Sequence, residues 1–212
     1  MMKEKPCRRI LIHSGSDVAA LLAILALIFF FSSGVWGSEG NGGDGSGGKF
    51  ITEIGVVTGY GSGNIPEGRY QPILLIGHLG VDLKRYISGL RNHQGTLSAF
   101  IEPQVNPVLD PSTNFEAGIG VGLQYSYPVY EPLSLYILGS TGPHYVSVVT
   151  KKQANGFLFS NVFGAGIYYS LSKDSALHVG YRFRHMSNAD LAEPNGGIDT
   201  HMGVVGYSLF FK

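Results

Sequence analysis

Residues 114–127 read NFEAGIGVGLQYSY, and the order of apolar and polar side chains in this stretch decides the fold class. Apolar or aromatic side chains occupy every odd-numbered position, and Asn, Glu, Gly, Gln and Ser occupy the even-numbered ones. Successive side chains of a β-strand point to opposite faces of its sheet, so a period of two is typical of a strand. The stretch therefore predicts a β-strand with one apolar face and one face of small or polar groups.

The same alternation recurs along the chain. In 157–170 every odd position is again apolar or aromatic except Asn161, and Ser160, Gly164, Gly166 and Ser170 lie on the other face. The segment 72–83, PILLIGHLGVDL, alternates least cleanly. The pattern predicts eight antiparallel strands, at about 50–60, 70–82, 96–106, 114–128, 132–147, 156–170, 176–187 and 199–211.

The composition of the two faces indicates which one is inside. A soluble barrel fills its interior with bulky apolar groups, but here the second face carries mostly Gly, Ser and single charges. Such a face suits a narrow, hydrogen-bonded lumen, and the apolar face then meets lipid. The sequence predicts an all-β fold, an eight-stranded antiparallel transmembrane β-barrel, in which Glu102 or Glu116 pairs with Arg182 or Arg184 inside.

The composition of the whole chain agrees with a membrane barrel. Charged residues make up 14% of the chain, well below the roughly 25% of soluble domains, and no stretch after residue 48 is long and apolar enough for a membrane helix. The formal net charge is +0, which gives no electrostatic reason to expect nucleic acid as a partner.

The N-terminal region reads as a targeting segment. Basic residues precede the apolar run VAALLAILALIFFF, and small residues follow it, which predicts a cleaved signal peptide at 1–37. The alternative is a membrane anchor, but the run is shorter than the about 20 residues of a usual span. A Gly- and Ser-rich linker is expected at 38–48 and the barrel domain at 49–212. We expect the protein in the bacterial outer membrane.

Three reactive side chains are expected together on the lipid face of the last hairpin. His185 and Ser187 share the face of the apolar residues before them, and Asp199 begins the next strand on the same face. Residues i and i+2 of a strand lie about 6.6–6.8 Å apart. A histidine can activate a serine across such a gap, and a carboxylate can orient the imidazole.

Each of these residues also has a structural interpretation. A His-x-Ser sequence is common in strands, and Asp199 can simply follow the Gly196–Gly197 turn. His201 suits an interfacial side chain with its polar tip among headgroups. Polar groups that face lipid are nevertheless costly and usually functional, and here three of them converge at one border.

The sequence YRFRHMSNADLAEPNGGIDTH, 181–201, resembles the motif of the PagL family of outer-membrane lipid A 3-O-deacylases and of its wider acyloxyacyl-hydrolase-like family. Weaker similarity extends over most of residues 50–212. The matching residues are His185, Ser187, Asn188, Ala189, Pro194, Asn195, Gly197 and Asp199.

The resemblance implies an eight-stranded barrel that removes an ester-linked acyl chain, the 3-O chain, from lipid A. It makes Ser187 the nucleophile, His185 the general base and Asp199 the orienting acid. The Asn188 backbone and the Asn195 side chain would bind the oxyanion, and neither a cofactor nor a metal is implied. The chain departs from the family at two positions: Asp199 stands where the family has Glu, and Asp190 where it has Gly, beside the oxyanion donors.

The sequence leaves two alternatives to a lipid A hydrolase. One is a non-catalytic barrel with a structural or adhesive role, and the other is an outer-membrane phospholipase with the same serine chemistry. The expected partners are lipid A, as part of lipopolysaccharide, and outer-membrane lipid. Both a monomer and a homodimer remain open.

Overall fold

The computed structural model describes residues 50–211, so the predicted signal peptide, 1–37, and the predicted linker, 38–48, lie outside the described residues. The described part folds as one compact unit. Its elements are β1 Glu53–Ile65, β2 Gly68–Tyr70, β3 Ile73–Asp82, the 3-10 helices η1 Leu83–Arg85 and η2 Ser88–Leu90, β4 Thr96–Val108, β5 Asn114–Tyr130, β6 Leu133–Val146, β7 Gly156–Ser172, β8 Ser175–Ser187 and β9 Ile198–Phe210. Among these residues no helix is both long and apolar enough to span a bilayer.

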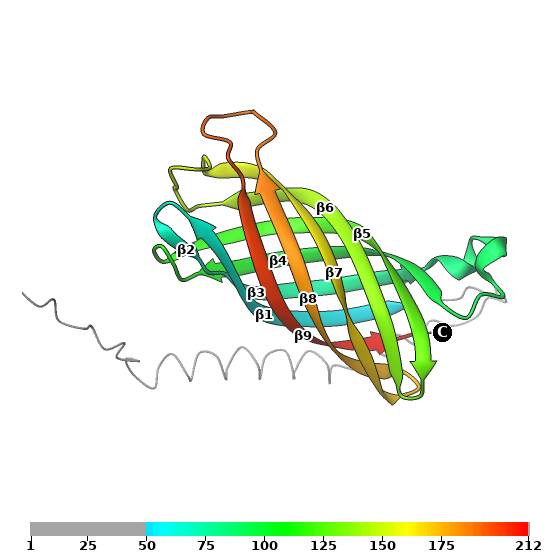
Figure 1. Ribbon diagram of the computed structural model, residues 1–212. Coiled ribbons are helices and arrows are strands. Elements are labelled where there is room, and N and C mark those ends of the chain that lie inside the picture. The colour runs from blue at the N-terminus through cyan, green and yellow to red at the C-terminus, as the bar shows by residue number, and fades with distance from the viewer. Residues whose placement is uncertain (1–49, 212) are drawn as a thin grey trace, which may run out of the picture. The chain divides into compact units, whose positions relative to one another are not determined.

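The strands form a closed antiparallel barrel (Figure 1). Each of β3 to β9 pairs with its neighbour in sequence, and β1 closes the sheet by pairing with both β3 and β9. The closing ladder runs from Glu53 opposite Phe210 to Ser62 opposite His201. All strands except β2 belong to the barrel, so the prediction of eight antiparallel strands is confirmed.

One predicted strand is divided. The second strand, expected at 70–82, begins at Ile73, and β2 extends β1 as a short hairpin instead. Pro72 separates the two, because proline has no N–H to donate to a ladder. Its carbonyl still accepts a hydrogen bond from the N–H of Gly61 at 2.9 Å.

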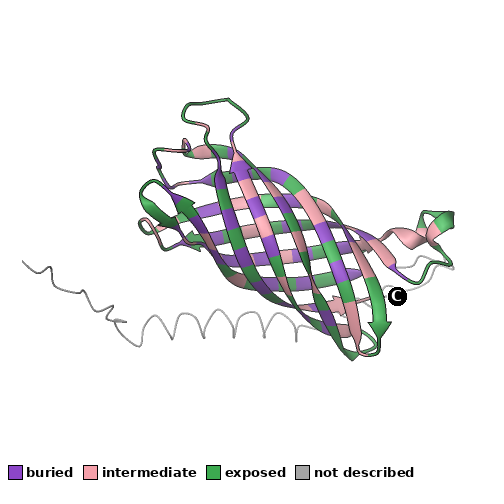
Figure 2. Ribbon diagram, in the orientation of Figure 1, coloured by how far each residue is buried: buried purple, intermediate pink, exposed green. Residues whose placement is uncertain are grey.

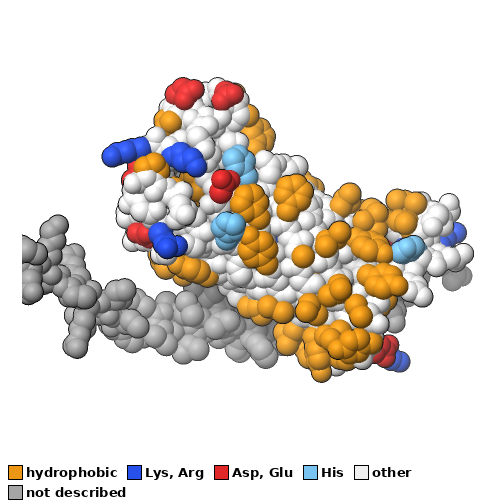
Figure 3. All heavy atoms as spheres, in the orientation of Figure 1, with side chains coloured by type: hydrophobic (Ala, Val, Ile, Leu, Met, Phe, Trp, Pro, Cys, Tyr) orange, Lys and Arg blue, Asp and Glu red, His pale blue; other side chains and the backbone are white. Residues whose placement is uncertain are grey.

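The two faces of the sheet differ in burial as expected. More exposed and more buried residues alternate along most of the length of the barrel strands (Figure 2). In β5 Phe115, Ile119, Val121 and Leu123 are each about half exposed, whereas Glu116 and Gln124 are buried. Apolar side chains cover much of the outer wall (Figure 3), as in a barrel whose wall contacts lipid.

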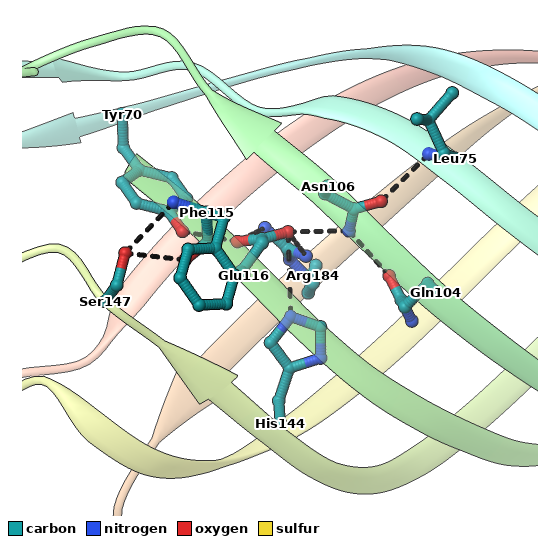
Figure 4. Close-up of polar contacts among 9 residues, drawn as sticks. All are labelled: Tyr70, Leu75, Gln104, Asn106, Phe115, Glu116, His144, Ser147 and Arg184. Atoms are coloured by element: carbon teal, nitrogen blue, oxygen red, sulfur yellow. Dashed lines mark hydrogen bonds and ion pairs between the residues drawn. The ribbon is translucent and has the colours of Figure 1, made fainter. Parts of the chain in front are cut away.

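The buried charges inside the barrel form pairs. Arg182 donates to both carboxylate oxygens of Glu102, at 2.7 and 2.9 Å. Arg184 donates to both of Glu116, at 2.6 and 3.1 Å. The predicted pairing of these four residues is therefore confirmed. Figure 4 shows that Glu116 also accepts from Asn106, at 2.8 Å, and from the hydroxyl of Tyr70.

The interior is less polar than the sequence analysis expected. Two apolar clusters fill it, because the interior of an eight-stranded barrel is narrow enough for side chains to occupy completely. The first contains Val57, Leu74, Ile76, Phe100, Tyr136, Leu138, Val162, Tyr168, Ala176, Met202 and Val204. The second contains Ile65, Tyr70, Val108, Val146, Val148, Leu158, Met186 and Ile198. Since β3 contributes Leu74 and Ile76 to the inside, its sequence is apolar on both faces and alternates poorly.

Candidate active site on the outer wall

Strand register places a histidine beside a carboxylate on the outside of the barrel. His185 of β8 lies directly opposite Asp199 of β9. Their neighbours Met186 and Ile198 are buried inside, so the alternation of both strands turns His185 and Asp199 outward. This pair lies near the barrel end that carries the segment 188–197, hereafter the loop end (Figure 1).

The two side chains are hydrogen-bonded. Nδ1 of His185 lies 2.6 Å from Oδ1 of Asp199, and the side chains are 43% and 51% exposed. A carboxylate on Nδ1 holds the imidazole in the tautomer whose Nε2 is unprotonated, and it stabilises the ring once Nε2 takes a proton. The pair can therefore serve as an oriented general base that faces the surroundings of the barrel.

Ser187 lies on the same outer face, two residues beyond His185. It is partly exposed at the end of β8 and lies opposite Phe159 of β7. Within residues 50–211 no hydrogen bond joins its hydroxyl to His185. The structure thus couples two of the three proposed catalytic residues directly and places the third beside them. Catalytic hydrogen bonds are often long before substrate binds.

Gly197 borders the imidazole, a contact that sequence reasoning did not assign. Its φ of +69° belongs to the left-handed region, and a Cβ at this position would lie 2.6 Å from Cε1 of His185. Its N–H donates to Oε1 of the buried Gln153 at 2.9 Å. A glycine is needed here because any side chain would displace the ring.

The proposed oxyanion donors lie together but are engaged with each other. The backbone N–H of Asn188 donates to Oδ1 of Asn195 at 3.0 Å, and Nδ2 of Asn188 donates to the carbonyl of Ala192 at 2.6 Å. Nδ2 of Asn195 donates to Oδ1 of Asp190 at 2.7 Å. Asp190 has φ +61°, a conformation that suits glycine best and that Asp tolerates. Asp190 therefore keeps a backbone conformation that glycine also adopts, and its carboxylate adds a hydrogen-bond acceptor for Asn195.

The other two histidines of β8 and β9 lie on opposite faces of the sheet. His178 is buried inside, with ring contacts to Tyr136 and Tyr168. His201 is exposed on the outer wall, where Nδ1 lies 2.5 Å from the Tyr181 hydroxyl and the ring contacts Phe183. In Figure 3 histidine and acidic side chains lie beside apolar ones near the loop end. Within the described part of the chain no group of three or more His, Cys, Asp or Glu residues is arranged to hold a metal ion.

The comparisons with known proteins single out the same region. The family model for lipid A 3-O-deacylase (PagL) matches residues 115–208. These residues contain nearly all of β5, the whole of β6 to β8, most of β9 and the whole candidate site. The predicted resemblance to this family is confirmed. No curated protein matches the sequence. The match, together with the apolar outer wall, indicates a protein of the bacterial outer membrane.

Solved structures share the barrel. The crystal structure of the outer membrane enzyme PagL aligns with a TM-score of 0.53 and 16% identity, over 73% of this chain and 97% of that chain. The structure of Neisserial surface protein A aligns with a TM-score of 0.55 and 12% identity, over 78% of this chain and 100% of that chain. At these identities the likeness shows the fold alone, so an activity has to be argued from the site.

Proposed function

We propose that the protein is an outer-membrane ester hydrolase that removes an acyl chain from lipid A. The observation that carries this proposal is the hydrogen-bonded pair of His185 and Asp199, which faces outward where the barrel wall meets lipid. Ser187 lies on the same face, and all three residues fall in the region that matches the lipid A 3-O-deacylase family. That family description also supports the 3-position as the ester attacked.

The residues support acyl transfer through a covalent serine intermediate. The hydroxyl oxygen of Ser187 attacks the ester carbonyl carbon while Nε2 of His185 accepts the hydroxyl proton, and Asp199 stabilises the imidazolium. The tetrahedral intermediate collapses, the ester C–O bond breaks, and His185 returns the proton to the leaving sugar alkoxide. Water then attacks the acyl-serine with the same base, which releases a fatty acid and restores Ser187.

The negative charge that develops on the carbonyl oxygen needs donors. The backbone N–H of Asn188 and the amide of Asn195 are the proposed ones. Asn188 must exchange its present acceptor for the substrate oxygen, while Asn195 retains a second amide hydrogen beside the one given to Asp190.

The position of the site suits a lipid substrate. An ester near a lipid headgroup can reach the outer wall at the loop end while its acyl chain stays along the apolar wall. Lys and Arg side chains also lie near the loop end (Figure 3). Among them Arg69 donates to Ser62 at 3.2 Å, and Ser62 lies opposite His201 on the same outer face. A cation there favours an anionic lipid headgroup.

Purified, folded protein incubated with lipid A tests the proposal, with the products analysed by mass spectrometry. We expect lipid A to lose the mass of one ester-linked acyl chain, and Ser187→Ala to abolish the loss while the barrel stays folded. A parallel incubation with phospholipid vesicles separates the alternatives. Hydrolysis of phospholipid alone identifies a phospholipase, and no hydrolysis of either lipid indicates a non-catalytic barrel.

A further inference from the structure

One polar side chain interrupts the apolar outer face of β7. The outward residues of this strand are aromatic or aliphatic except Asn161, which is partly exposed on the outer wall. An amide that faces lipid is costly and calls for a function. Its position is specific, because Asn161 lies directly opposite His185 on one side and Thr141 on the other.

These contacts form one row across the outer wall. Thr141 of β6, Asn161 of β7, His185 of β8 and Asp199 of β9 are successive cross-strand partners. Hydrogen bonds join the two ends of the row, from the Thr141 hydroxyl to Oδ1 of Asn161 at 2.8 Å and from His185 to Asp199 at 2.6 Å. The polar residues of four adjacent strands therefore lie at one level of an otherwise apolar wall.

The hydrogen bond from Thr141 determines which end of the Asn161 amide is left free. With Oδ1 occupied by the threonine hydroxyl, the NH₂ group of Asn161 keeps two hydrogens. Neither has an acceptor within residues 50–211. A primary amide that faces outward beside the proposed general base is thus held with its donors available.

The reaction at this site needs such a donor. Both loop donors, the Asn188 N–H and the Asn195 amide, are bonded within the loop. Ser187 lies opposite Phe159, so Asn161 is its diagonal neighbour across the β7–β8 ladder. Diagonal cross-strand residues lie about 7–8 Å apart, within reach of longer side chains and of a substrate atom bound between them.

We propose that Nδ2 of Asn161 donates a hydrogen bond to the carbonyl oxygen of the lipid ester while Ser187 attacks it. This inference rests on the proposed hydrolase function. It assigns the oxyanion a donor that is already in place on a rigid strand, whereas the backbone N–H of Asn188 must first give up its bond to Asn195. Each residue of the row then has one role. Thr141 orients Asn161, Asn161 binds the ester carbonyl oxygen, and Asp199 orients His185.

The test compares substitutions in steady-state hydrolysis of lipid A by purified, folded protein. Asn161→Leu gives the position the apolar character of its neighbours, and we expect kcat to fall about 100-fold with little change in KM, as when one oxyanion donor is lost. Asn161→Asp should lower kcat at least as far, because a carboxylate repels the developing charge. Thr141→Val is the matched control: it removes the orienting hydroxyl but keeps the amide, so its loss should be much smaller. Asn161→Gln, which keeps an amide on a longer side chain, should recover part of the loss.

Several outcomes would overturn the proposal. The amide does not bind the oxyanion if Asn161→Leu keeps the wild-type kcat or if only KM rises. Should Asn161→Leu fail to fold, Asn161→Ala and Asn161→Asp make the same comparison. Failure of the hydrolase function itself looks different, since wild-type protein would then release no fatty acid.

Discussion

At the scale of single residues, the site depends on what strand register brings into contact. The acid is one methylene shorter than the Glu expected from the family resemblance, yet Asp199 contacts the imidazole of His185 at 2.6 Å. It reaches because the two residues are direct cross-strand partners, whose Cβ atoms lie only about 4.5–5.5 Å apart. Backbone placement therefore replaces the missing length of side chain.

Replacement of this carboxylate tests its role. In Asp199→Asn the amide can hold the imidazole in the wrong tautomer and cannot stabilise the imidazolium. We expect kcat for lipid A hydrolysis to fall about 10⁴-fold, as in other triads with this change, with the barrel still folded. Asp199→Glu, which restores the family residue, should keep far more activity. Equal activity of Asp199→Asn and wild-type protein would remove Asp199 from the mechanism.

Asp190 offers a second test at this scale. Its carboxylate accepts a hydrogen bond from Asn195, and its φ is +61°. Asp190→Gly removes the acceptor that now holds the Asn195 amide, and glycine adopts the left-handed φ of this position without strain. We therefore expect a several-fold higher kcat and an unchanged free energy of unfolding. Asp190→Asn keeps an acceptor oxygen and serves as the control. A lower kcat in Asp190→Gly would mean that the carboxylate holds Asn195 in its working position.

The sequence predicted part of this site and missed the rest for a physical reason. The period of two already turns His185, Ser187 and Asp199 to one face, since it depends only on backbone geometry. The bond from Gly197 to Gln153 joins two loops that are far apart in sequence, and no local pattern reports it. Asn161 was visible as an exception on an apolar face, but only the register of β7 and β8 shows that it lies beside His185.

At the scale of elements, paired charges inside the barrel support the strands that carry the site. Arg184 lies between Phe183 and His185 in β8, and its guanidinium is held by Glu116 of β5 across the lumen. Figure 4 shows this contact within a wider set of hydrogen bonds. The sequence predicted the pairing from charge and alternation. It did not predict the apolar clusters beside the ion pairs, because their members come from separate strands and meet only when the barrel closes.

Loss of one partner of this pair should destabilise the barrel. Glu116→Ala leaves the buried Arg184 without a counterion, which costs about 3–5 kcal/mol. Urea unfolding of the barrel refolded in lipid vesicles measures this free energy. Glu131→Ala, at an exposed turn, is the control and should shift it by less than about 0.5 kcal/mol. Equal stability of the two variants would show that the pair contributes nothing to folding.

At the scale of the whole molecule, the barrel differs from a soluble one in that the more apolar face of its sheet lies on the outside. Its outer wall is largely apolar, and the ion pairs of Glu102 with Arg182 and of Glu116 with Arg184 are buried inside. The polar row that includes His185 and Asp199 lies on the outer wall near the loop end. A lipid-facing wall makes the depth of each position matter, since a charge is most costly at the centre of the bilayer.

Arginine substitutions at two depths of β7 test this arrangement. Phe163, in the middle of the strand, is 67% exposed, and Leu171, near its end, is 53% exposed. We expect Phe163→Arg to lower the free energy of unfolding in vesicles by about 2–4 kcal/mol and Leu171→Arg by about 0–1 kcal/mol. Similar values for both positions would contradict a wall that spans the membrane.

The most direct test of the account is to locate the nucleophile. Folded protein is treated with a serine-reactive lipid phosphonate, and the modified peptide is identified by mass spectrometry. We expect an adduct on Ser187 that is lost in His185→Ala, because the imidazole must take the serine proton. An adduct on a different serine, or continued lipid A hydrolysis by a protein that lacks the Ser187 hydroxyl, would contradict it.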